Sequence, residues 1–379
     1  MRRWDVIVLG LGGVGSSACF HLAKSGMSVL GIDQYSPGHS FGSSHGQTRI
    51  VRQAYFEGVG YVPLLKRSYE LWDQLNQLVV KPLFVRCGLL QMGPPDGVVV
   101  PGVLRSAKAH DLKVRTYSPE ELTQVWPGIC CESSHVGVFE SNAGYVDVER
   151  AVVTQLQLAR SEGAELLHGA RVTAYEERLD GVSVSMNGRT FHARQLVLAL
   201  GPWSSTWLSN LIGANIRILR KHLYWFEAHP GTLRVDTGAP CFFHETSRGH
   251  FYGFPRIDSS GVKIAMHSGG AVVHQPQASD HESIEEDSEL QECLRYADAC
   301  LPGVTQRLTR QQVCYYSMTP DEAFIFGRLA DESRLIVAAG LSGHGFKFTP
   351  VLGELISQIA SHEELKYDLT AFSPSRWMN

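Results

Sequence analysis

The chain has 379 residues, of which 44% are hydrophobic and 19% are charged, and its formal net charge is −4 at pH 7. This length and apolar content are enough for two domains with cores of their own. The small net charge argues against nucleic acid or an anionic membrane as a partner, no apolar run is long enough for a transmembrane helix, and the first strand begins too close to Met1 to leave room for a signal peptide.

The first predicted unit is strand, helix, strand. Residues 6–9 form an apolar run typical of a strand buried on both faces, and Gly10, Gly12 and Gly15 follow as G-x-G-x-x-G. In such a motif the first glycine turns the chain, the second lets a pyrophosphate approach the backbone, and the third lets the helix pack on the sheet. The helix N-terminus then offers N–H groups and partial positive charge to the phosphates.

The second strand, residues 29–32, ends in Asp33, whose carboxylate can accept hydrogen bonds from a ribose 2′-OH. The strand, the three glycines, the helix and the acid together predict an adenine dinucleotide site. A Gly-rich turn of another α/β protein is the alternative, and it leaves Asp33 unexplained. The motif alone does not separate NAD from FAD.

A polar loop over residues 35–47 leads into the sequence SSHGQTRIVRQAY, which places His45, Arg49 and Arg52 within eight residues. We interpret this stretch as a loop entering a helix, on which Arg49 and Arg52 share one face because they are three residues apart. Two like charges on one face repel, so the pattern favours an anion between them.

The middle of the chain predicts structural elements without chemistry. An amphipathic helix is expected over 60–79 and a strand leaving the first domain over 84–92. Ser118 and Asp147 are expected to cap helices, the second of which covers 148–162. Further strands are expected at 166–168, 170–177, 182–186 and 191–200.

Two later stretches carry polar residues at strand spacing. In residues 262–267, alternation places Lys263 and His267 on one face, which in the absence of other information is an ordinary solvent face. In residues 311–317 it places Cys314 and Tyr316 on one face. A buried strand, 335–339, then runs into a Gly-rich loop and a helix over 350–361, and the N–H groups of such a loop can hold an anion or an electron-rich ring edge.

Taken together, these motifs resemble the monomeric sarcosine oxidase family of flavoproteins, which includes N-methyltryptophan oxidase and pipecolate oxidase. The resemblance runs from residue 6 to about residue 372, and it rests on GSSHGQTRIVRQAY, YGFP, the strand with Lys263 and His267, VCYY with PDE, and SGHGFKF. It implies an α/β fold, α+β overall, with a glutathione-reductase-type FAD-binding Rossmann domain and a discontinuous mixed-β-sheet substrate domain. The implied boundaries are 1–85, 146–220 and 320–379 for the FAD domain, and 86–145 and 221–319 for the substrate domain.

The resemblance implies one FAD per chain, attached covalently through its 8α-methyl group to Cys314. A buried structural cysteine is the ordinary alternative for this residue. The implied cofactor-binding residues are Gly10, Gly12, Gly15, Asp33, Ser44, Thr48, Val172, Cys314, Gly343, Gly345 and Phe346.

The resemblance also implies the residues that contact the substrate. Arg52 and Lys347 match the pair that holds its carboxylate, and Phe243 falls beside the cavity, where a bulky ring favours a small amine. Lys263 matches a lysine that activates O₂, since a fixed cation stabilises the charge that develops there. His267 matches a histidine that positions the amine, and the remaining matches near the reacting groups are Arg49, Tyr252, Tyr316 and His45.

The implied reaction is oxidation of a secondary amino acid, N-methylated or cyclic, to an imine, with O₂ reduced to H₂O₂. For sarcosine, hydrolysis of the imine gives glycine and formaldehyde. L-Pipecolate or N-methyltryptophan oxidation, a flavin amine dehydrogenase with a protein electron acceptor, and a non-catalytic nucleotide-binding protein remain alternatives.

The eight cysteines are scattered and contain no Cys-x-x-Cys pair, and the vicinal Cys130 and Cys131 are interpreted as incidental. We therefore expect reduced thiols, a cytoplasmic location and no structural metal. A monomer that takes only small molecules, an amino acid and O₂, is expected.

Overall fold

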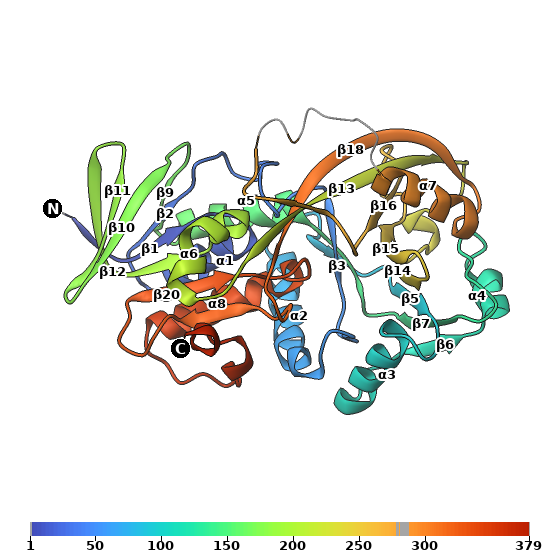
Figure 1. The fold of residues 1–379 in the computed structure, drawn as a ribbon, viewed down its shortest axis with the longest axis horizontal. Helices are drawn as coiled ribbons and strands as arrows, with labels where there is room; N and C mark the ends of the chain where they lie inside the picture. The colour runs from blue at the N-terminus through green and yellow to red at the C-terminus, as the bar shows by residue number, and fades with distance from the viewer. Residues whose placement is uncertain (1, 278–279, 281–287, 379) are drawn as a thin grey trace.

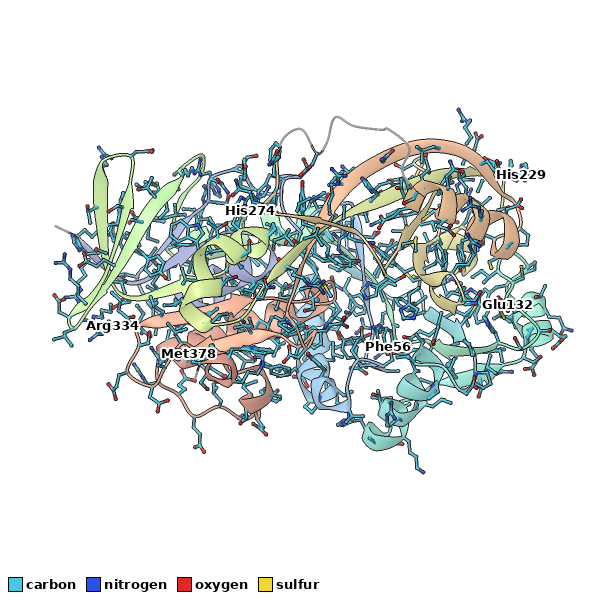
Figure 2. The ribbon with its side chains drawn as sticks, in the orientation of Figure 1. Phe56, Glu132, His229, His274, Arg334 and Met378 are labelled. Atoms are coloured by element: carbon cyan, nitrogen blue, oxygen red, sulfur yellow. The ribbon has the colours of Figure 1, made fainter. Side chains whose placement is uncertain are left out.

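The computed structural model describes residues 2–277, 280 and 288–378. Its strands form a sheet of eight strands, a sheet of nine strands and a small sheet of three. Figure 1 shows the two large sheets in separate lobes, with strand β3 of the small sheet between them. In Figure 2, Arg334 and Met378 mark the first lobe, Glu132 and His229 the second, and Phe56 lies where they meet.

The eight-stranded sheet contains the predicted dinucleotide unit. Its parallel part consists of β1 (Arg3–Leu9), β2 (Val29–Ile32), β9 (Glu165–Leu167), β12 (Arg189–Leu198) and β20 (Leu335–Ala339). Three antiparallel strands complete it, namely β10 (Val172–Arg178), β11 (Gly181–Met186) and β19 (Ile325–Arg328). The predicted strands of this sheet are confirmed to within three residues at each end.

Helices cover both faces of this sheet, which explains why β1 is apolar from Val6 to Leu9. On one face α1 (Gly13–Lys24) packs against both α5 (Val148–Ser161) and α8 (Thr349–Ala360). Residues of α6 (Ser204–Ile212) join the core on the other face. Val6, Ile7 and Val8 are therefore completely buried, as a strand inside a doubly wound sheet requires.

The nine-stranded sheet forms the second lobe. Its strands are β5 (Leu89–Gly93), β6 (Arg115–Tyr117), β7 (Val136–Glu140), β13 (Arg217–Ala228), β14 (Cys241–Thr246), β15 (Gly249–Phe254), β16 (Val262–Met266), β17 (Ala271–Val273) and β18 (Val304–Met318). The associated helices are α3 (Val99–His110), α4 (Pro119–Val125) and α7 (Ser288–Cys300). The long antiparallel pair of β13 and β18 reaches from one lobe into the other (Figure 1).

The small sheet corrects the predicted helix around the two arginines. Residues Thr48–Val51 form strand β3, which pairs with β8 (Gly144–Asp147), and β8 pairs with β4 (Phe84–Val85). The β-branched residues of this stretch suit the pairing with β8. Arg49 and Arg52 therefore do not share a helix face, and they belong to two separate cationic groups of the site described below.

The predicted strand over 84–92 is also wrong as a single element. Gly88 has a φ of +82°, which a continuous strand does not allow, and it separates β4 from β5. The two halves join different sheets, β4 the small one and β5 the nine-stranded one. The helix expected over 60–79 is α2 (Val62–Gln77), and Ser118 and Asp147 cap α4 and α5 as predicted.

None of the helices in the described part of the chain is both long and apolar enough to cross a membrane. The strands of each large sheet come from separate stretches of the chain, and the two-domain boundaries given above stay a prediction.

Candidate active site

A cavity of about 810 Å³ connects the two large sheets. At one end Leu9, Ile32 and Ala339 line it, at the carboxyl ends of β1, β2 and β20. At the other end Phe243 and Tyr252 line it, from β14 and β15. Doubly wound sheets bind ligands at the carboxyl ends of their strands, so the cavity lies where the sequence predicts the dinucleotide.

Most of the predicted site residues line this cavity. They are Gly10, Gly12, Asp33, Ser44, Arg49, Arg52, Val172, Phe243, Tyr252, His267, Cys314, Tyr316, Gly343, Gly345, Phe346 and Lys347. The other four, Gly15, His45, Thr48 and Lys263, lie outside its lining.

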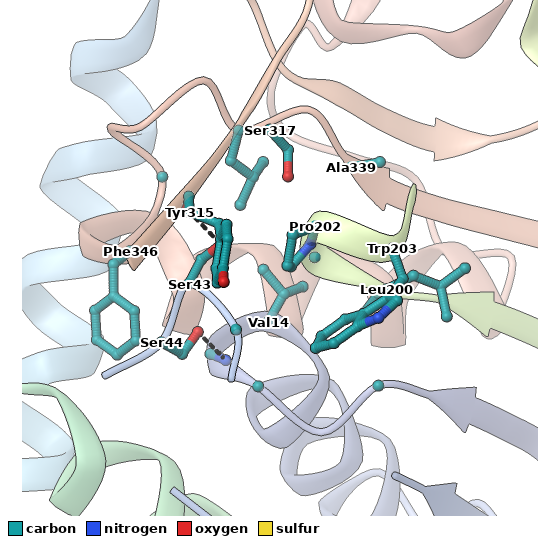
Figure 3. Close-up of a pocket in the computed structure, with 18 of the residues that line it drawn as sticks. Val14, Ser43, Ser44, Leu200, Pro202, Trp203, Tyr315, Ser317, Ala339 and Phe346 are labelled. Atoms are coloured by element: carbon teal, nitrogen blue, oxygen red, sulfur yellow. Dashed lines mark hydrogen bonds between the residues drawn. The ribbon is translucent and has the colours of Figure 1, made fainter. Parts of the chain in front are cut away.

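Because the glycines carry no side chains, the backbone at the start of α1 is exposed to the cavity. Gly10 has a φ of +86°, and a Cβ there would lie 2.3 Å from Ala199 O. A Cβ on Gly15 would lie 1.7 Å from Gly10 O, so the helix packs on the strand only with glycine. In Figure 3, Ser44 accepts the N–H of Gly13 at 3.0 Å, beside the first turn of α1. A backbone this close suits a pyrophosphate.

Asp33 stands beside the same turn. Its Oδ2 accepts the N–H of Leu11 at 2.7 Å, and its Oδ1 accepts the N–H of Tyr35 at 2.8 Å. Because a carboxylate has about four acceptor positions, capacity remains for hydroxyl groups of a ribose. Arg171 and Val172 line the adjoining wall, and Arg171 is a cation that the sequence reasoning did not single out.

Cys314 lies at the far end of the cavity, in strand β18, and it is 1% exposed. Arg49 Nη2 donates to its sulfur at 3.0 Å and to Ser43 O at 2.9 Å. Burial disfavours the charged form of Arg49, but the Cys314 sulfur beside it raises the pKa of the guanidinium. The positive charge of Arg49 therefore lies directly beside the Cys314 sulfur.

Lys263 lies behind Arg49, with its Nζ held by backbone and hydroxyl oxygens. It donates to Gly46 O at 2.6 Å, to Thr48 O at 3.0 Å and to Thr48 Oγ1 at 3.3 Å. Burial lowers the pKa of Lys263. The three oxygen acceptors act in the opposite direction, because they match the three N–H bonds of an ammonium group. His45, 1% exposed, is buried away from the cavity lining.

Arg52 and Lys347 form a second cationic group around Glu57. Arg52 Nη2 donates to Glu57 Oε1 at 2.5 Å, and Lys347 Nζ donates to His344 O at 2.6 Å. Burial and then Arg52 lower the pKa of Lys347 to about 7. Burial raises the pKa of Glu57, but Arg52, His344 and Lys347 together lower it to about 2, so this carboxylate is charged at neutral pH.

Sequence reasoning missed three members of this group, which are Glu57, Tyr55 and His344. The Tyr55 hydroxyl bonds His344 Nδ1, and His344 Nε2 lies 3.1 Å from Glu322 O. Because a carbonyl only accepts, Nε2 carries the proton and Nδ1 accepts from Tyr55. The sequence contains one indication of Glu57, because it is an acidic residue five positions after Arg52 and the predicted cations Arg52 and Lys347 would attract an acid.

Aromatic side chains enclose the space between the two cationic groups. His267 Nδ1 lies 3.3 Å from the Tyr316 hydroxyl, and burial lowers the pKa of His267 to about 3, which leaves the ring neutral. The Phe243 ring lies 5.6 Å from the His267 ring and 5.1 Å from that of Phe56, centroid to centroid. Burial also raises the pKa of Tyr252 to about 12.

The Gly-rich loop after β20 passes directly over this space. Gly343 has a φ of +78°, and a Cβ there would lie 2.5 Å from the Tyr316 ring. The loop continues into a short 3₁₀ helix, Phe346–Phe348, that leads into α8. Figure 3 shows Phe346 and Ser44 along one side of the cavity and Trp203 and Leu200 along another.

These observations meet the requirements of FAD. The bare helix turn and Asp33 suit the ADP half, and one cavity joins them to Cys314 and the Gly-rich loop, which suit the ring half. Among the described residues no group of three or more His, Cys, Asp or Glu is arranged to hold a metal ion.

Comparison with protein families gives a match over residues 5–359 to the FAD dependent oxidoreductase family, DAO. The chain is 38% identical to monomeric sarcosine oxidase of Streptomyces avermitilis, over 98% of this chain and 97% of that one. It is 35% identical to N-methyl-L-tryptophan oxidase of Salmonella arizonae, over 99% of both chains. Monomeric sarcosine oxidase of Bacillus sp. is 34% identical, over 99% of this chain and 96% of that one.

Solved structures with lower identity share the fold. NikD, described as an unusual amino acid oxidase essential for nikkomycin biosynthesis, aligns with a TM-score of 0.85 at 22% identity, over 99% of this chain and 98% of that one. Glycine oxidase from Geobacillus kaustophilus aligns with a TM-score of 0.80 at 20% identity, over 99% of both chains. The predicted fold class, an FAD-binding Rossmann domain joined to a mixed sheet, is confirmed.

Proposed function

Since the chain belongs to the family of FAD-dependent oxidoreductases, we propose that it is an amine oxidase for a small secondary amino acid such as sarcosine. The substrate is oxidised to an imine, O₂ is reduced to H₂O₂, and water hydrolyses the imine, which for sarcosine gives glycine and formaldehyde. One observation carries the proposal: Arg52, Lys347 and His267 line the same cavity as Cys314.

Arg52 and Lys347 are proposed to hold the substrate carboxylate. A guanidinium presents paired donors that fix the direction of a carboxylate, and an ammonium group adds a point charge. In the structure, the Glu57 carboxylate is the hydrogen-bond partner of Arg52. The incoming substrate carboxylate therefore replaces the Glu57 carboxylate at Arg52. This exchange keeps the buried arginine paired with a carboxylate before and after binding.

His267 is proposed to position the amine. Its pKa of about 3 keeps the imidazole neutral at working pH, so one ring nitrogen can accept an N–H of the substrate. Tyr316 contacts Nδ1 and fixes the ring. The Phe243 ring against His267 and Phe56 limits the length of the substrate, and this favours sarcosine over N-methyltryptophan or pipecolate.

FAD is proposed to lie along the cavity with Cys314 as its covalent attachment point. The residues that hold it are the α1 turn with Asp33 at one end and the loop around Gly343 at the other. Bound FAD supplies the redox chemistry, since its ring takes two electrons from a substrate C–H bond and releases them to O₂. The protein supplies position, charge and exclusion of water.

Arg49 and Lys263 are proposed to provide the positive charge for O₂ reduction. The three N–H bonds of a Lys263 ammonium are engaged by Gly46 and Thr48, so the residue acts through its field and not by donating to oxygen. A fixed cation lowers the barrier to a step in which negative charge develops nearby.

The proposal includes a monomer in the cytoplasm. Two relatives carry the word monomeric in their names. No disulfide bond joins any of the cysteines that the structure describes, and unbridged cysteines are usual in a reducing compartment.

The test is aerobic turnover of the purified holoprotein with sarcosine. We expect O₂ consumption with formation of H₂O₂ and formaldehyde in equal amounts. Rapid reduction of a dye without any peroxide would instead support a dehydrogenase that passes electrons to a partner and would refute the oxidase.

A further inference from the structure

Outside the cavity lining, two cysteines from distant parts of the chain touch. Cys87 lies in the link between β4 and β5, and Cys241 begins β14, yet their Sγ atoms are 3.6 Å apart. The parallel pairing of β5 with β14 produces this approach, because the N–H of Cys241 donates to Gly88 O at 3.1 Å. The contact is therefore a consequence of the sheet and not of a chance loop position.

The two thiols differ in access and in acidity. Cys241 is completely buried, whereas Cys87 is partly exposed. The hydrogen bond from Cys241 lowers the pKa of Cys87, while burial raises the pKa of Cys241. Burial also raises the pKa of Cys19 and of Cys130. The partner that solvent reaches is thus the one that ionises more readily, as a thiol that attacks an oxidant must.

We propose that Cys87 and Cys241 form a reversible disulfide when the protein meets a hydroperoxide. The Cys87 thiolate attacks one oxygen of H₂O₂, the O–O bond breaks, and Cys87 becomes a sulfenic acid while the other oxygen leaves as hydroxide and takes up a proton. The Cys241 sulfur then attacks the Cys87 sulfur, the S–O bond breaks, and hydroxide leaves with the Cys241 proton as water. In total two thiols are oxidised and one H₂O₂ is reduced to two molecules of water.

The local backbone permits the bond. A disulfide requires an S–S distance of about 2.05 Å, so the sulfurs must approach by about 1.6 Å from their present contact. Cys87 belongs to neither strand of its own segment, since β4 ends at Val85 and β5 begins at Leu89. The backbone at Cys87 can therefore adjust without breaking a hydrogen bond of either strand.

The bond would tie the link between the small sheet and the nine-stranded sheet to strand β14. β4 belongs to the small sheet with β3, which carries Thr48 and Arg49. β14 carries Phe243, which lines the cavity. The proposed oxidase activity would generate the oxidant within the same protein, but the reaction does not rest on that activity, because peroxide added from outside is sufficient.

The test is peptide mapping of the holoprotein after treatment with H₂O₂ and alkylation of the remaining thiols. We expect two thiols per chain to be lost, a cross-linked peptide joining Cys87 to Cys241, and full recovery of both thiols with dithiothreitol. The Cys241→Ser variant should instead accumulate a sulfenic acid on Cys87 that dimedone traps. Cys130→Ser is the matched control, and it should leave the cross-link unchanged.

Two results would overturn the proposal. One is a wild-type map in which peroxide oxidises other cysteines while Cys87 and Cys241 remain alkylatable. The other is direct overoxidation of Cys87 to a sulfinic acid without a cross-link. Both results are read from the wild-type protein, so they do not depend on how well a variant folds, and neither depends on whether the protein oxidises an amine.

Discussion

Replacing Lys347 with methionine removes one charge from the carboxylate site and keeps a side chain of similar length. In the structure, burial and Arg52 lower the pKa of this lysine to about 7. A carboxylate ligand stabilises the ammonium form, so binding is strongest while Lys347 is protonated. Affinity must therefore fall as pH rises through 7, by about tenfold between pH 6 and pH 8 for a single group with this pKa.

The variant should bind carboxylates more weakly and lose this pH dependence. A hydrogen bond to a charged partner is worth about 1.5–3 kcal/mol, which corresponds to a Kd about 10- to 150-fold higher. The assay is titration of the holoprotein with propionate, followed by flavin absorbance at several pH values. Propionate has no amine, so its own ionisation does not interfere. An equal pH dependence in wild type and Lys347→Met would refute the assignment of Lys347 to the carboxylate.

Three further predictions concern other groups of the site. Glu57→Gln removes the carboxylate that competes for Arg52, so KM for sarcosine should fall about tenfold, and an unchanged or higher KM would show that Glu57 does not compete. Phe243→Ala should raise the ratio of kcat/KM for N-methyltryptophan to that for sarcosine, because it opens the wall against Phe56, and no change in this ratio would contradict a size limit at Phe243. Wild-type flavin should stay on the polypeptide in a denaturing gel and leave it in Cys314→Ser, and complete release from the wild type would exclude the covalent bond.

The sequence predicted those parts of the molecule that depend on neighbouring residues. The glycine turn, Asp33, and the caps at Ser118 and Asp147 follow from local geometry, and the structure contains each of them. The resemblance predicted the site residues, and most of them line one cavity in the structure.

What the sequence could not predict depends on partners far along the chain. Thr48–Val51 is a strand because it pairs with Gly144–Asp147, almost a hundred residues later. The predicted strand over 84–92 breaks because its halves join different sheets. Glu57 lies near Arg52 in the sequence, but its electrostatic interaction with Lys347 depends on a residue almost three hundred positions later.

Anaerobic titration of the holoprotein with sarcosine tests the central claim most directly. We expect the flavin absorbance to bleach with one equivalent of substrate per chain and to return when air is admitted. A folded, flavin-loaded protein that neither sarcosine nor any other secondary amino acid bleaches would contradict the account and would indicate a nucleotide-binding protein without this activity.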